Sequence, residues 1–331
     1  MNDEHDDRKE IRWGIVGCGA VTERKSGPAY QKADGFKLAA VMRRDYTKAQ
    51  DYATRHGVEF WSSDAEDIIN SDDIDAVYVA TPPDSHKYYA LKVAEAGKPC
   101  CIEKPLAPSY RDCLTICRAF DDKKIPLFVA YYRRSLPRFN AVREALETNR
   151  IGETRHITWN LSKPPSEADL AGTSNWRTDK SIAVGGYFDD LASHGLDLFA
   201  YLLGDFDQVF GVGLNQQHLY SSMDAVTACW SHTNGITGTG SWNFGCNVRE
   251  DDVVIYGSAG SIKFSVFDEK PIVISSANGE QKMFVDNPGN IQLHHVQNIA
   301  RSLIGGAPHP SNGASASHTA WVMDKILGGI D

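Results

Sequence analysis

Asp190 and His194 are the pair whose residue types and spacing best suit proton transfer. They lie four residues apart within residues 186–203, where the apolar pattern predicts a long helix, so their side chains share one face. An imidazole that titrates near neutral pH can take the proton of an alcohol or return it, and a carboxylate one turn away can orient the substrate. The alternative is an ordinary helical ion pair on a solvated face. Asp197, one turn after His194, is expected to be structural.

Lys104 lies just past an apolar run, residues 99–102, that predicts a short strand. Ligands of parallel α/β sheets bind beside the carboxyl ends of the strands. An ammonium at such an end can hold a substrate hydroxyl or carbonyl oxygen and stabilise developing alkoxide charge. The alternative is a strand-end lysine in a turn without a ligand. Lys104 is therefore a candidate catalytic and substrate-binding residue.

A glycine-rich segment follows the first predicted strand and opens the first predicted helix. It reads Gly17-Cys18-Gly19-Ala20-Val21-Thr22. This context favours a dinucleotide-binding fingerprint, because Gly17 permits a tight turn and Gly19 lets backbone N–H groups approach a pyrophosphate. Thr22 stands where Gly or Ala usually packs the helix against the strand, which predicts a slightly displaced helix. A glycine turn with no ligand is the alternative.

Arg43 and Arg44 follow the second predicted strand, residues 36–42, where NAD-binding folds usually carry an acid for the ribose 2′-hydroxyl. An arginine can bind a 2′-phosphate through two hydrogen bonds and stack on the adenine. The pair therefore favours NADP. Asp45 can still reach a ribose hydroxyl, which leaves NAD open, and two exposed surface arginines are the alternative without a ligand.

Two kinds of pattern divide the chain. Residues 11–131 alternate apolar runs with amphipathic stretches, which is typical of βαβ units around a parallel sheet, whereas segments beyond residue 152 mostly alternate polar and apolar residues. We therefore expect an α/β Rossmann domain with a doubly wound parallel sheet, followed by an α+β domain with a mostly antiparallel open sheet and helices on one face. The predicted bounds are a disordered tail at residues 1–10, a dinucleotide-binding domain at 11–133, and a substrate-binding and oligomerisation domain at 134–331.

Individual elements can be placed within this outline. Strands are predicted at residues 11–16, 36–42, 75–81, 99–103, 126–132, 156–161, 227–232, 238–244, 251–256, 261–267 and 271–276. Helices are predicted at residues 21–32, 47–56, 65–69, 85–96, 110–122, 138–148, 186–203, 293–304 and 314–327.

Three motifs follow the glycine segment in order. They are Thr81-Pro82-Pro83-Asp84-Ser85-His86, Ala96-Gly97-Lys98-Pro99 and Glu103-Lys104-Pro105. Their separations resemble the Gfo/Idh/MocA oxidoreductases, the family of glucose–fructose oxidoreductase and inositol dehydrogenases, over nearly the whole chain. The resemblance implies hydride transfer between a nicotinamide and the carbinol or carbonyl carbon of a sugar, polyol or sugar derivative.

The resemblance also implies residue roles. Lys104, Asp190 and His194 would form the catalytic set, and Glu103 would support the nicotinamide ribose and Lys104. Further cofactor contacts are expected from Thr81, Pro82, His86, Trp176 and Arg177. The alternatives are a helix start at His86 and a buried aromatic residue beside a surface arginine at Trp176-Arg177.

Tyr131 and Arg133, at the end of the strand predicted at residues 126–132, are candidate substrate-binding residues. Packing at the domain junction is the alternative.

Three functions fit this pattern, because a fold alone does not decide function. The first is a simple NAD(P)-dependent sugar or polyol dehydrogenase or reductase. The second is a redox-initiated lyase or glycosidase, in which transient oxidation precedes elimination and the hydride then returns. The third is a dinucleotide-binding regulator without catalysis, and Lys104, Asp190 and His194 together argue against it.

The composition of the chain limits the classes of partner that the protein is expected to bind. A formal net charge of −9 disfavours nucleic acid, and no apolar run approaches the ~18 residues needed to cross a bilayer. The first ten residues lack the apolar stretch of a secretory signal, so we predict a cytoplasmic protein, and the family resemblance implies a small sugar-like substrate. Seven scattered cysteines predict reduced thiols and no metal site. An open sheet with one uncovered apolar face predicts a homodimer or a dimer of dimers.

Overall fold

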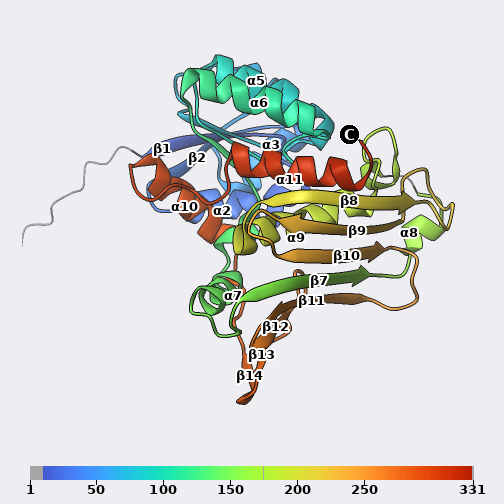
Figure 1. Cartoon of the computed structure of the whole chain (residues 1–331). Coiled ribbons are helices and arrows are strands. Elements are labelled where there is room, and N and C mark those ends of the chain that lie inside the picture. The colour runs from blue at the N-terminus through green and yellow to red at the C-terminus, as the bar shows by residue number, and fades with distance from the viewer. Residues whose placement is uncertain (1–9, 174, 330–331) are drawn as a thin grey trace, which may run out of the picture. The chain divides into compact units, whose positions relative to one another are not determined.

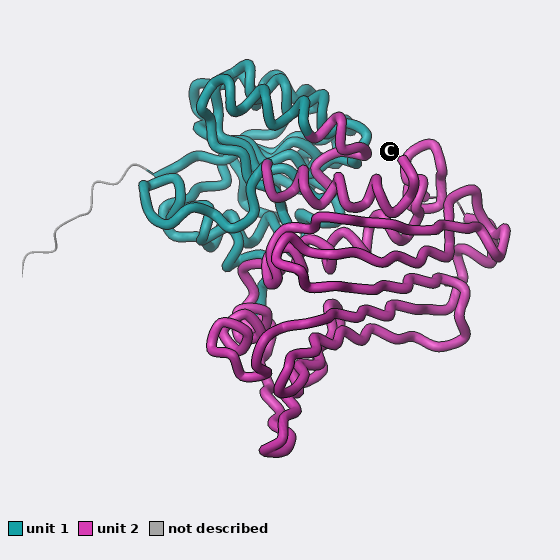
Figure 2. Tube along the Cα trace, viewed as in Figure 1, with its two compact units in different colours: residues 1–104, 114–132, 288–313 teal, residues 105–113, 133–287, 314–331 magenta. Residues whose placement is uncertain are grey.

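The computed structural model describes residues 10–173 and 175–329 (Figure 1). The tail expected at residues 1–10 lies outside this range, except for Glu10. Contacts divide the chain into two compact units, which Figure 2 shows in two colours. The first comprises the described residues up to Lys104 with Leu114–Tyr132 and Pro288–Gly313, and the second comprises Pro105–Cys113, Arg133–Asn287 and the described residues from Ala314. The sequence pattern placed a single boundary after residue 133, because periodicity does not reveal that residues 288–313 pack with the first sheet.

The first unit is built on a parallel sheet of six strands in the order β3-β2-β1-β4-β5-β6. The strands are β1 (Ile11–Val16), β2 (Phe36–Met42), β3 (Phe60–Ser62), β4 (Ala76–Val79), β5 (Cys100–Ile102) and β6 (Leu127–Val129). The order reverses between β1 and β4, the switch point where doubly wound folds bind ligands at the carboxyl ends of their strands. The predicted Rossmann sheet is confirmed. β3 was not predicted, because three residues are too few to show a period.

The helices of the first sheet agree closely with prediction, apart from the first one. They are α1 (Ala20–Arg24), α2 (Ser26–Lys32), α3 (Tyr46–His56), α4 (Glu66–Ile69), α5 (Pro83–Glu95), α6 (Tyr110–Lys123), which crosses the division between the units, and α10 (Leu293–Leu303). The single helix predicted at residues 21–32 is two, broken at Lys25. Pro28 has no N–H to donate to Arg24, and its ring would clash with that carbonyl group, so the first helix ends there.

The second unit contains an eight-stranded sheet in the order β14-β13-β12-β11-β7-β10-β9-β8. The strands are β7 (Thr154–Ser162), β8 (Phe206–Leu214), β9 (Ala225–His232), β10 (Thr237–Asn243), β11 (Glu250–Gly257), β12 (Gly260–Phe264), β13 (Ile272–Ser276) and β14 (Gly279–Met283). Every pair is antiparallel except β7 with β10, which confirms the predicted mostly antiparallel sheet. β8 and β14 were missed. Two glycines dilute the apolar pattern of β8, and β14 has no apolar side chain before its last residue, Met283.

Helix α9 (Tyr187–Leu203) packs against one face of this sheet. A Cβ added at Gly195 would lie 2.3 Å from the Trp159 ring, so glycine permits the close approach of helix and strand. Around this point Trp159 makes edge-to-face contacts with Phe199 at 5.4 Å and with Trp242 at 5.5 Å. These contacts fix the rotation of α9 and therefore the direction of its remaining face.

A buried ion pair holds α9 further along. Arg134 Nε lies 2.7 Å from Asp197 Oδ2 and Nη2 lies 2.8 Å from Oδ1, and Thr319 Oγ1 is 3.2 Å from the same carboxylate. Burial raises the pKa of Asp197, and the charge of Arg134 opposes that rise. Such a pair mainly specifies one arrangement of its elements, which gives Asp197 a structural role.

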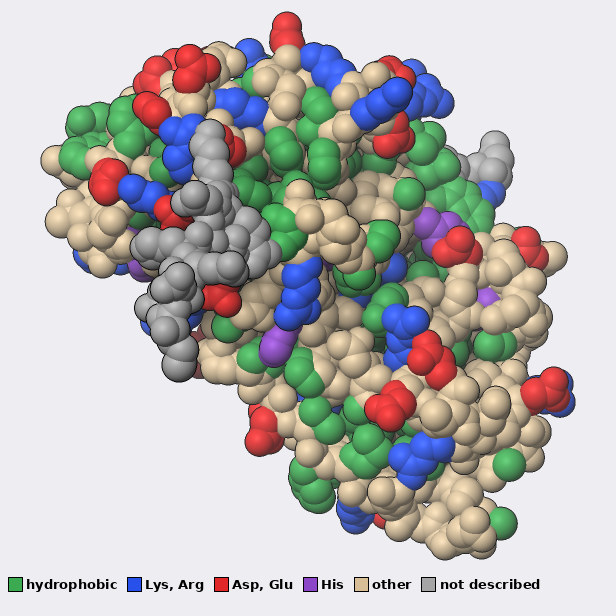
Figure 3. All heavy atoms as spheres, turned by 90° about the vertical axis from the view of Figure 1, so that its left-hand side faces the viewer, with side chains coloured by type: hydrophobic (Ala, Val, Ile, Leu, Met, Phe, Trp, Pro, Cys, Tyr) green, Lys and Arg blue, Asp and Glu red, His purple; other side chains and the backbone are tan. Residues whose placement is uncertain are grey.

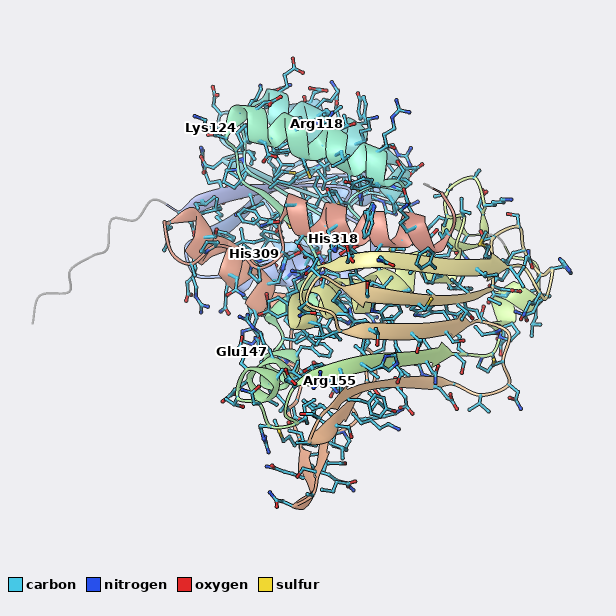
Figure 4. The ribbon with its side chains drawn as sticks, in the orientation of Figure 1. Arg118, Lys124, Glu147, Arg155, His309 and His318 are labelled. Atoms are coloured by element: carbon cyan, nitrogen blue, oxygen red, sulfur yellow. The ribbon has the colours of Figure 1, made fainter. Side chains whose placement is uncertain are left out.

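The other helices of the second unit are shorter or lie at its edges. They are α7 (Pro137–Glu147), α8 (Glu167–Leu170) and α11 (Gly313–Ile326). Phe206 N, at the start of β8, donates to His318 Nε2 of α11 at 2.9 Å (Figure 4). None of the described helices is both long and apolar enough to cross a bilayer. On the face drawn in Figure 3, basic and acidic side chains are interspersed.

Candidate active site

The turn between β1 and α1 has the close backbone geometry of a dinucleotide site. Gly17 has a φ of +97°, and a Cβ there would lie 2.7 Å from Thr81 Cγ2 and 2.9 Å from Thr81 N, so only glycine fits. The amides of Gly17 and Cys18 both donate to Met42 O at 2.9 Å, which ties the turn to β2. Burial raises the pKa of the Cys18 thiol to about 11, so its side chain belongs to the core and its contribution to a ligand would come from the backbone.

The start of α1 remains open to an anion. A Cβ added at Gly19 would meet no atom closer than 3.8 Å, and the amides of Ala20 and Val21 belong to the first turn, where no intrahelical acceptor exists. Thr22, which the sequence marked as unusual, is fully buried and forms a cap: its hydroxyl accepts from Gly19 N at 3.0 Å and donates to Gly19 O at 2.9 Å. These two hydrogen bonds are how the helix start accommodates a threonine.

Arg43 and Arg44 follow β2 at the same edge of the sheet as the glycine turn. Among the described residues their guanidinium groups have no hydrogen-bond or ion-pair partner. Asp45 instead caps α3: Oδ1 accepts from Lys48 N at 3.2 Å, and Oδ2 lies 3.1 Å from Lys48 Nζ. The hydrogen bonds from Lys48 hold the pKa of Asp45 below its ordinary value. The acid that could bind a ribose hydroxyl is therefore engaged in a helix cap.

The buried carboxylate of Glu103 organises the end of β5. Its Oε1 accepts from Tyr78 OH at 2.5 Å and from Gln292 Nε2 at 3.2 Å, and its Oε2 accepts from Lys104 N at 3.1 Å. Glu103 is 8% exposed and Tyr78 is fully buried. Residues from β4, from the end of β5 and from the loop before α10 thus fix the backbone of Lys104.

The loop before α10 also contacts the end of α1. Gln292 N donates to Asn290 Oδ1 at 3.0 Å, and Asn290 Nδ2 donates at 2.8 Å to the carbonyl oxygen of Lys25, where α1 ends. Sequence reasoning missed Asn290 and Gln292, because Gln292 lies 189 positions from Glu103 and belongs to no motif.

His309 lies between α10 and α11, near the end of residues 288–313 (Figure 4). Its ring nitrogens lie 2.9 Å from Ser311 O and 3.2 Å from His295 O, and Ser311 Oγ donates to Val129 O of β6 at 2.7 Å. Residues 288–313 therefore belong to the structure of the first unit.

Thr81 and its neighbours shape the end of β4. His86 is fully buried with Nε2 2.8 Å from Thr81 O, and Ser85 Oγ donates to Thr81 Oγ1 at 2.8 Å. Pro82 directly precedes α5. Of these residues Thr81 packs against Gly17, and contact between Thr81, Pro82 or His86 and a cofactor stays a prediction.

In the second unit, Arg177 and Asp190 form an ion pair. Arg177 Nε lies 2.5 Å from Asp190 Oδ2, and the Arg177 guanidinium lies 4.4 Å from the centroid of the Trp176 ring. Sequence reasoning assigned Trp176 and Arg177 to the cofactor and did not predict the pairing with Asp190. The pair fixes the orientation of the Asp190 carboxylate.

The adjacent acid has a different role. Asp189 Oδ2 accepts from Gly185 N at 2.9 Å, and burial raises the pKa of Asp189 to about 7. Asp189 is therefore engaged with the backbone before α9, and a catalytic role for Asp190 stays a prediction.

His194 lies one turn after Asp190 and is 7% exposed. Its ring centroid is 6.0 Å from that of Phe267, and the guanidinium of Arg133 lies 4.6 Å from the centroid of the same ring. Arg133 Nε donates to Val266 O at 3.1 Å. Phe267 thus links two predicted site residues, and no periodic signal in the sequence marks it.

The predicted site residues are divided between the two units. Tyr131 is 1% exposed and belongs to the first unit, whereas Arg133 belongs to the second. Lys104 likewise lies in the first unit, and Asp190 with His194 in the second. Joint action of these residues on one substrate stays a prediction.

Comparison with known proteins places this geometry in a family. Residues 11–131 match the model described as an oxidoreductase family with an NAD-binding Rossmann fold, and residues 139–263 match the GFO/IDH/MocA C-terminal domain. Oxidoreductase P35 of Formosa agariphila is 34% identical over 96% of this chain and 98% of its own length. Inositol 2-dehydrogenase of Rhizobium meliloti is 33% identical over 59% of this chain and 56% of its own length.

The fold agrees with solved structures. Levoglucosan dehydrogenase in complex with NADH and levoglucosan has a TM-score of 0.84 at 24% identity, over 96% of both chains. On its full-length match to Oxidoreductase P35 and on both domain matches, the chain belongs to the Gfo/Idh/MocA family of NAD-binding oxidoreductases.

Proposed function

We propose that this protein transfers a hydride between a nicotinamide dinucleotide and the carbinol or carbonyl carbon of a sugar, polyol or sugar derivative. The observation that carries the proposal is the face of α9, where Arg177 orients Asp190 and His194 follows one turn later. The name of the relative inositol 2-dehydrogenase supports a polyol-like substrate class.

Each chemical role follows from a side chain. His194 takes the proton of the reacting hydroxyl group in oxidation and returns it in reduction. Asp190, oriented by Arg177, accepts a hydrogen bond from a neighbouring hydroxyl group and so positions the sugar. Lys104 binds the reacting oxygen, and the hydrogen bond from its backbone to Glu103 limits its movement.

The first unit fits a dinucleotide. Gly17 allows the tight turn, and Gly19 leaves room for a pyrophosphate beside the first amides of α1. When bound, the nicotinamide supplies or accepts the hydride. Arg43 and Arg44 support a preference for NADP, since both guanidinium groups lack a partner among the described residues and Asp45 is engaged with Lys48.

Two other functions remain distinguishable by their products. A redox-initiated lyase would form product without net consumption of the dinucleotide, and a regulator would bind the dinucleotide without turnover. The combination of Lys104, Asp190 and His194 favours the dehydrogenase, because a binding protein has no use for a proton carrier.

Self-association is the second part of the proposal. On β8 the side chains of Phe210, Val212 and Leu214 point away from α11 and are 63%, 63% and 54% exposed. Thr227 and Cys229 of β9, paired with Val212 and Phe210, extend this face. Contiguous apolar area of this kind is typical of an interface, and a second copy of the chain is the occupant we propose.

His194→Ala should lower kcat by about 10²–10⁴-fold, because the proton then has no carrier. Lys104→Met should lower it as well. If the two residues act on one transition state, the double variant should lose less than the product of the single losses, as measured by steady-state kinetics. Near-normal turnover in His194→Ala, or fully multiplicative losses, would contradict the assignment.

Tyr78→Phe should lower kcat on the order of 10-fold, because Glu103 loses a hydrogen bond and Lys104 is held less firmly. Tyr30→Phe is the matched control: Tyr30 is also fully buried and contacts the Tyr78 ring at 5.1 Å. Circular dichroism should show both variants folded. Equal losses of activity in the two would exclude positioning by Tyr78.

Arg43→Asp should raise the KM for NADPH far more than the KM for NADH, because only NADPH carries the 2′-phosphate. Arg118→Asp, on α6 (Figure 4), controls for charge reversal elsewhere on the surface. Initial rates with each cofactor give the two KM values, and an equal change in both would refute the NADP preference.

Val212→Glu should convert the expected dimer, or dimer of dimers, to smaller species at micromolar concentration, as measured by light scattering, because it places a charge in the apolar face. Phe284→Glu, at a residue that is 78% exposed outside the sheet, is the control. A wild-type monomer at that concentration would refute self-association.

A further inference from the structure

The chemically active face of α9 continues one turn before Asp190. Tyr187, Asp190 and His194 occupy positions i, i+3 and i+7 of the helix, so they share one face. With a rise of about 1.5 Å per residue, Tyr187 lies about 4.5 Å from Asp190 along the axis and about 10 Å from His194. This spacing is comparable with the length of a sugar molecule.

Lys163 lies over this extension. It follows the last residue of β7, and its Nζ is 3.5 Å from the centroid of the Tyr187 ring and 5.7 Å from that of Phe244. The two rings are themselves 5.5 Å apart. The ammonium is thus held by aromatic faces, which attract a cation but accept no conventional hydrogen bond.

The nearby acids are already engaged. Asp169 Oδ1 accepts from Tyr187 OH at 2.8 Å, and its Oδ2 accepts from Ser166 N at 2.8 Å and Ser166 Oγ at 2.7 Å. Asp190 is paired with Arg177. Within residues 10–173 and 175–329, Lys163 Nζ has no hydrogen-bond acceptor and no ion-pair partner. Its donors are therefore available to a ligand.

The surroundings explain why this arrangement is unusual for a lysine. Lys163 is partly buried, and desolvation lowers its pKa, with the charges of Asp169 and Asp190 opposing the change. A partly dehydrated ammonium without an acceptor is unfavourable in the free protein. A bound anion would satisfy it through a charge-assisted hydrogen bond.

We propose that Lys163 binds a carboxylate of the substrate, so that the sugar-like substrate is a sugar acid, with its carboxylate several carbon atoms from the carbinol that His194 serves. This inference rests on the proposed function.

A carboxylate fits better than a phosphate. The other cations near Lys163 are engaged, Arg177 with Asp190 and Arg249 with Asp268 at 2.6 Å. Since Arg177 balances the charge of Asp190, the ammonium of Lys163 faces only the charge of Asp169, and a carboxylate monoanion there meets about half the repulsion that a phosphate dianion would meet. Asp169 and Asp190 can instead accept hydrogen bonds from the hydroxyl groups of the sugar acid.

The test compares matched acid and neutral substrates. Wild-type protein is assayed with NAD and with NADP on D-glucuronate against D-glucose and on D-gluconate against D-glucitol, by the absorbance of the reduced nicotinamide. We expect a higher kcat/KM for at least one acid than for its neutral partner. Lys163→Met, which keeps the length and the aromatic packing, should lower kcat/KM for the acid by about 10- to 100-fold, mainly through KM.

Controls separate charge from structure. Lys163→Arg should retain most of the preference for the acid, and Lys163→Met should leave kcat/KM for the neutral partner within about 2-fold. Lys263→Met, on β12 and paired with Asp252, removes an unrelated exposed ammonium and should change neither value. If Lys163→Met does not fold by circular dichroism, Lys163→Gln takes its place.

The outcomes distinguish this inference from the function itself. Turnover of neutral polyols with no preference for acids, or equal losses on both in Lys163→Met, would overturn the role of Lys163 while the dehydrogenase proposal stands. Thermal stabilisation of the dinucleotide-loaded protein by glucuronate or gluconate that is lost in Lys163→Met, without turnover of any compound, would support carboxylate binding and refute hydride transfer. No thermal shift and no turnover with either acid would overturn the inference.

Discussion

The buried carboxylate of Glu103 is the constraint on which the nucleotide-binding unit depends. A buried charge is costly unless its oxygens are paired, and here Tyr78, Gln292 and the backbone of Lys104 pair them. Each partner comes from a different stretch of the chain, so the carboxylate is satisfied only when all three are in place. Asn290 extends this arrangement to the end of α1 through Lys25. The backbone of Lys104 is therefore connected to the helix that would hold the pyrophosphate.

In the second unit, close packing and a buried ion pair hold helix α9 in place. Gly195 lets α9 approach the Trp159 ring, and the buried pair of Arg134 with Asp197 holds the helix farther along. Asp190 and His194 lie nearer the start of the same helix, and a role in chemistry requires that their side chains have polar surroundings. Arg177 is such a polar partner for Asp190. Gly195 thus serves packing on one face of the helix, whereas Asp190, His194 and the structural residue Asp197, at positions i, i+4 and i+7, share another.

Much of this was predictable from the sequence because it depends on local patterns. The alternation of apolar runs gave the two sheets, and the turn at Gly17 follows from a strand, a glycine segment and a helix in order. The break at Lys25 was readable in principle from Pro28, whose missing N–H ends the preceding helix.

What the sequence did not reveal depends on contacts between distant segments. Gln292 acquires its role only where α10 packs with the first sheet, and Phe267 only where a loop reaches His194. Lys163 carried no signal either, because its significance is that its ammonium has no hydrogen-bond acceptor or ion-pair partner in the described structure, and no motif marks that. The pairing of Arg177 with Asp190 joins a short 3-10 helix, residues 176–178, to a residue of α9 that is 13 positions later, and no periodicity connects those two elements.

Transfer of deuterium from labelled dinucleotide tests the central claim most directly. NADPH and NADH carrying deuterium at both positions of the nicotinamide C4 are incubated with the protein and a panel of keto sugars, aldoses and their acids, and the products are examined by mass spectrometry and NMR. The account predicts deuterium on the newly formed carbinol carbon, in amounts equal to the dinucleotide oxidised, and loss of that transfer in His194→Ala. Product without net oxidation of the dinucleotide, or binding without transfer to any compound, would contradict it.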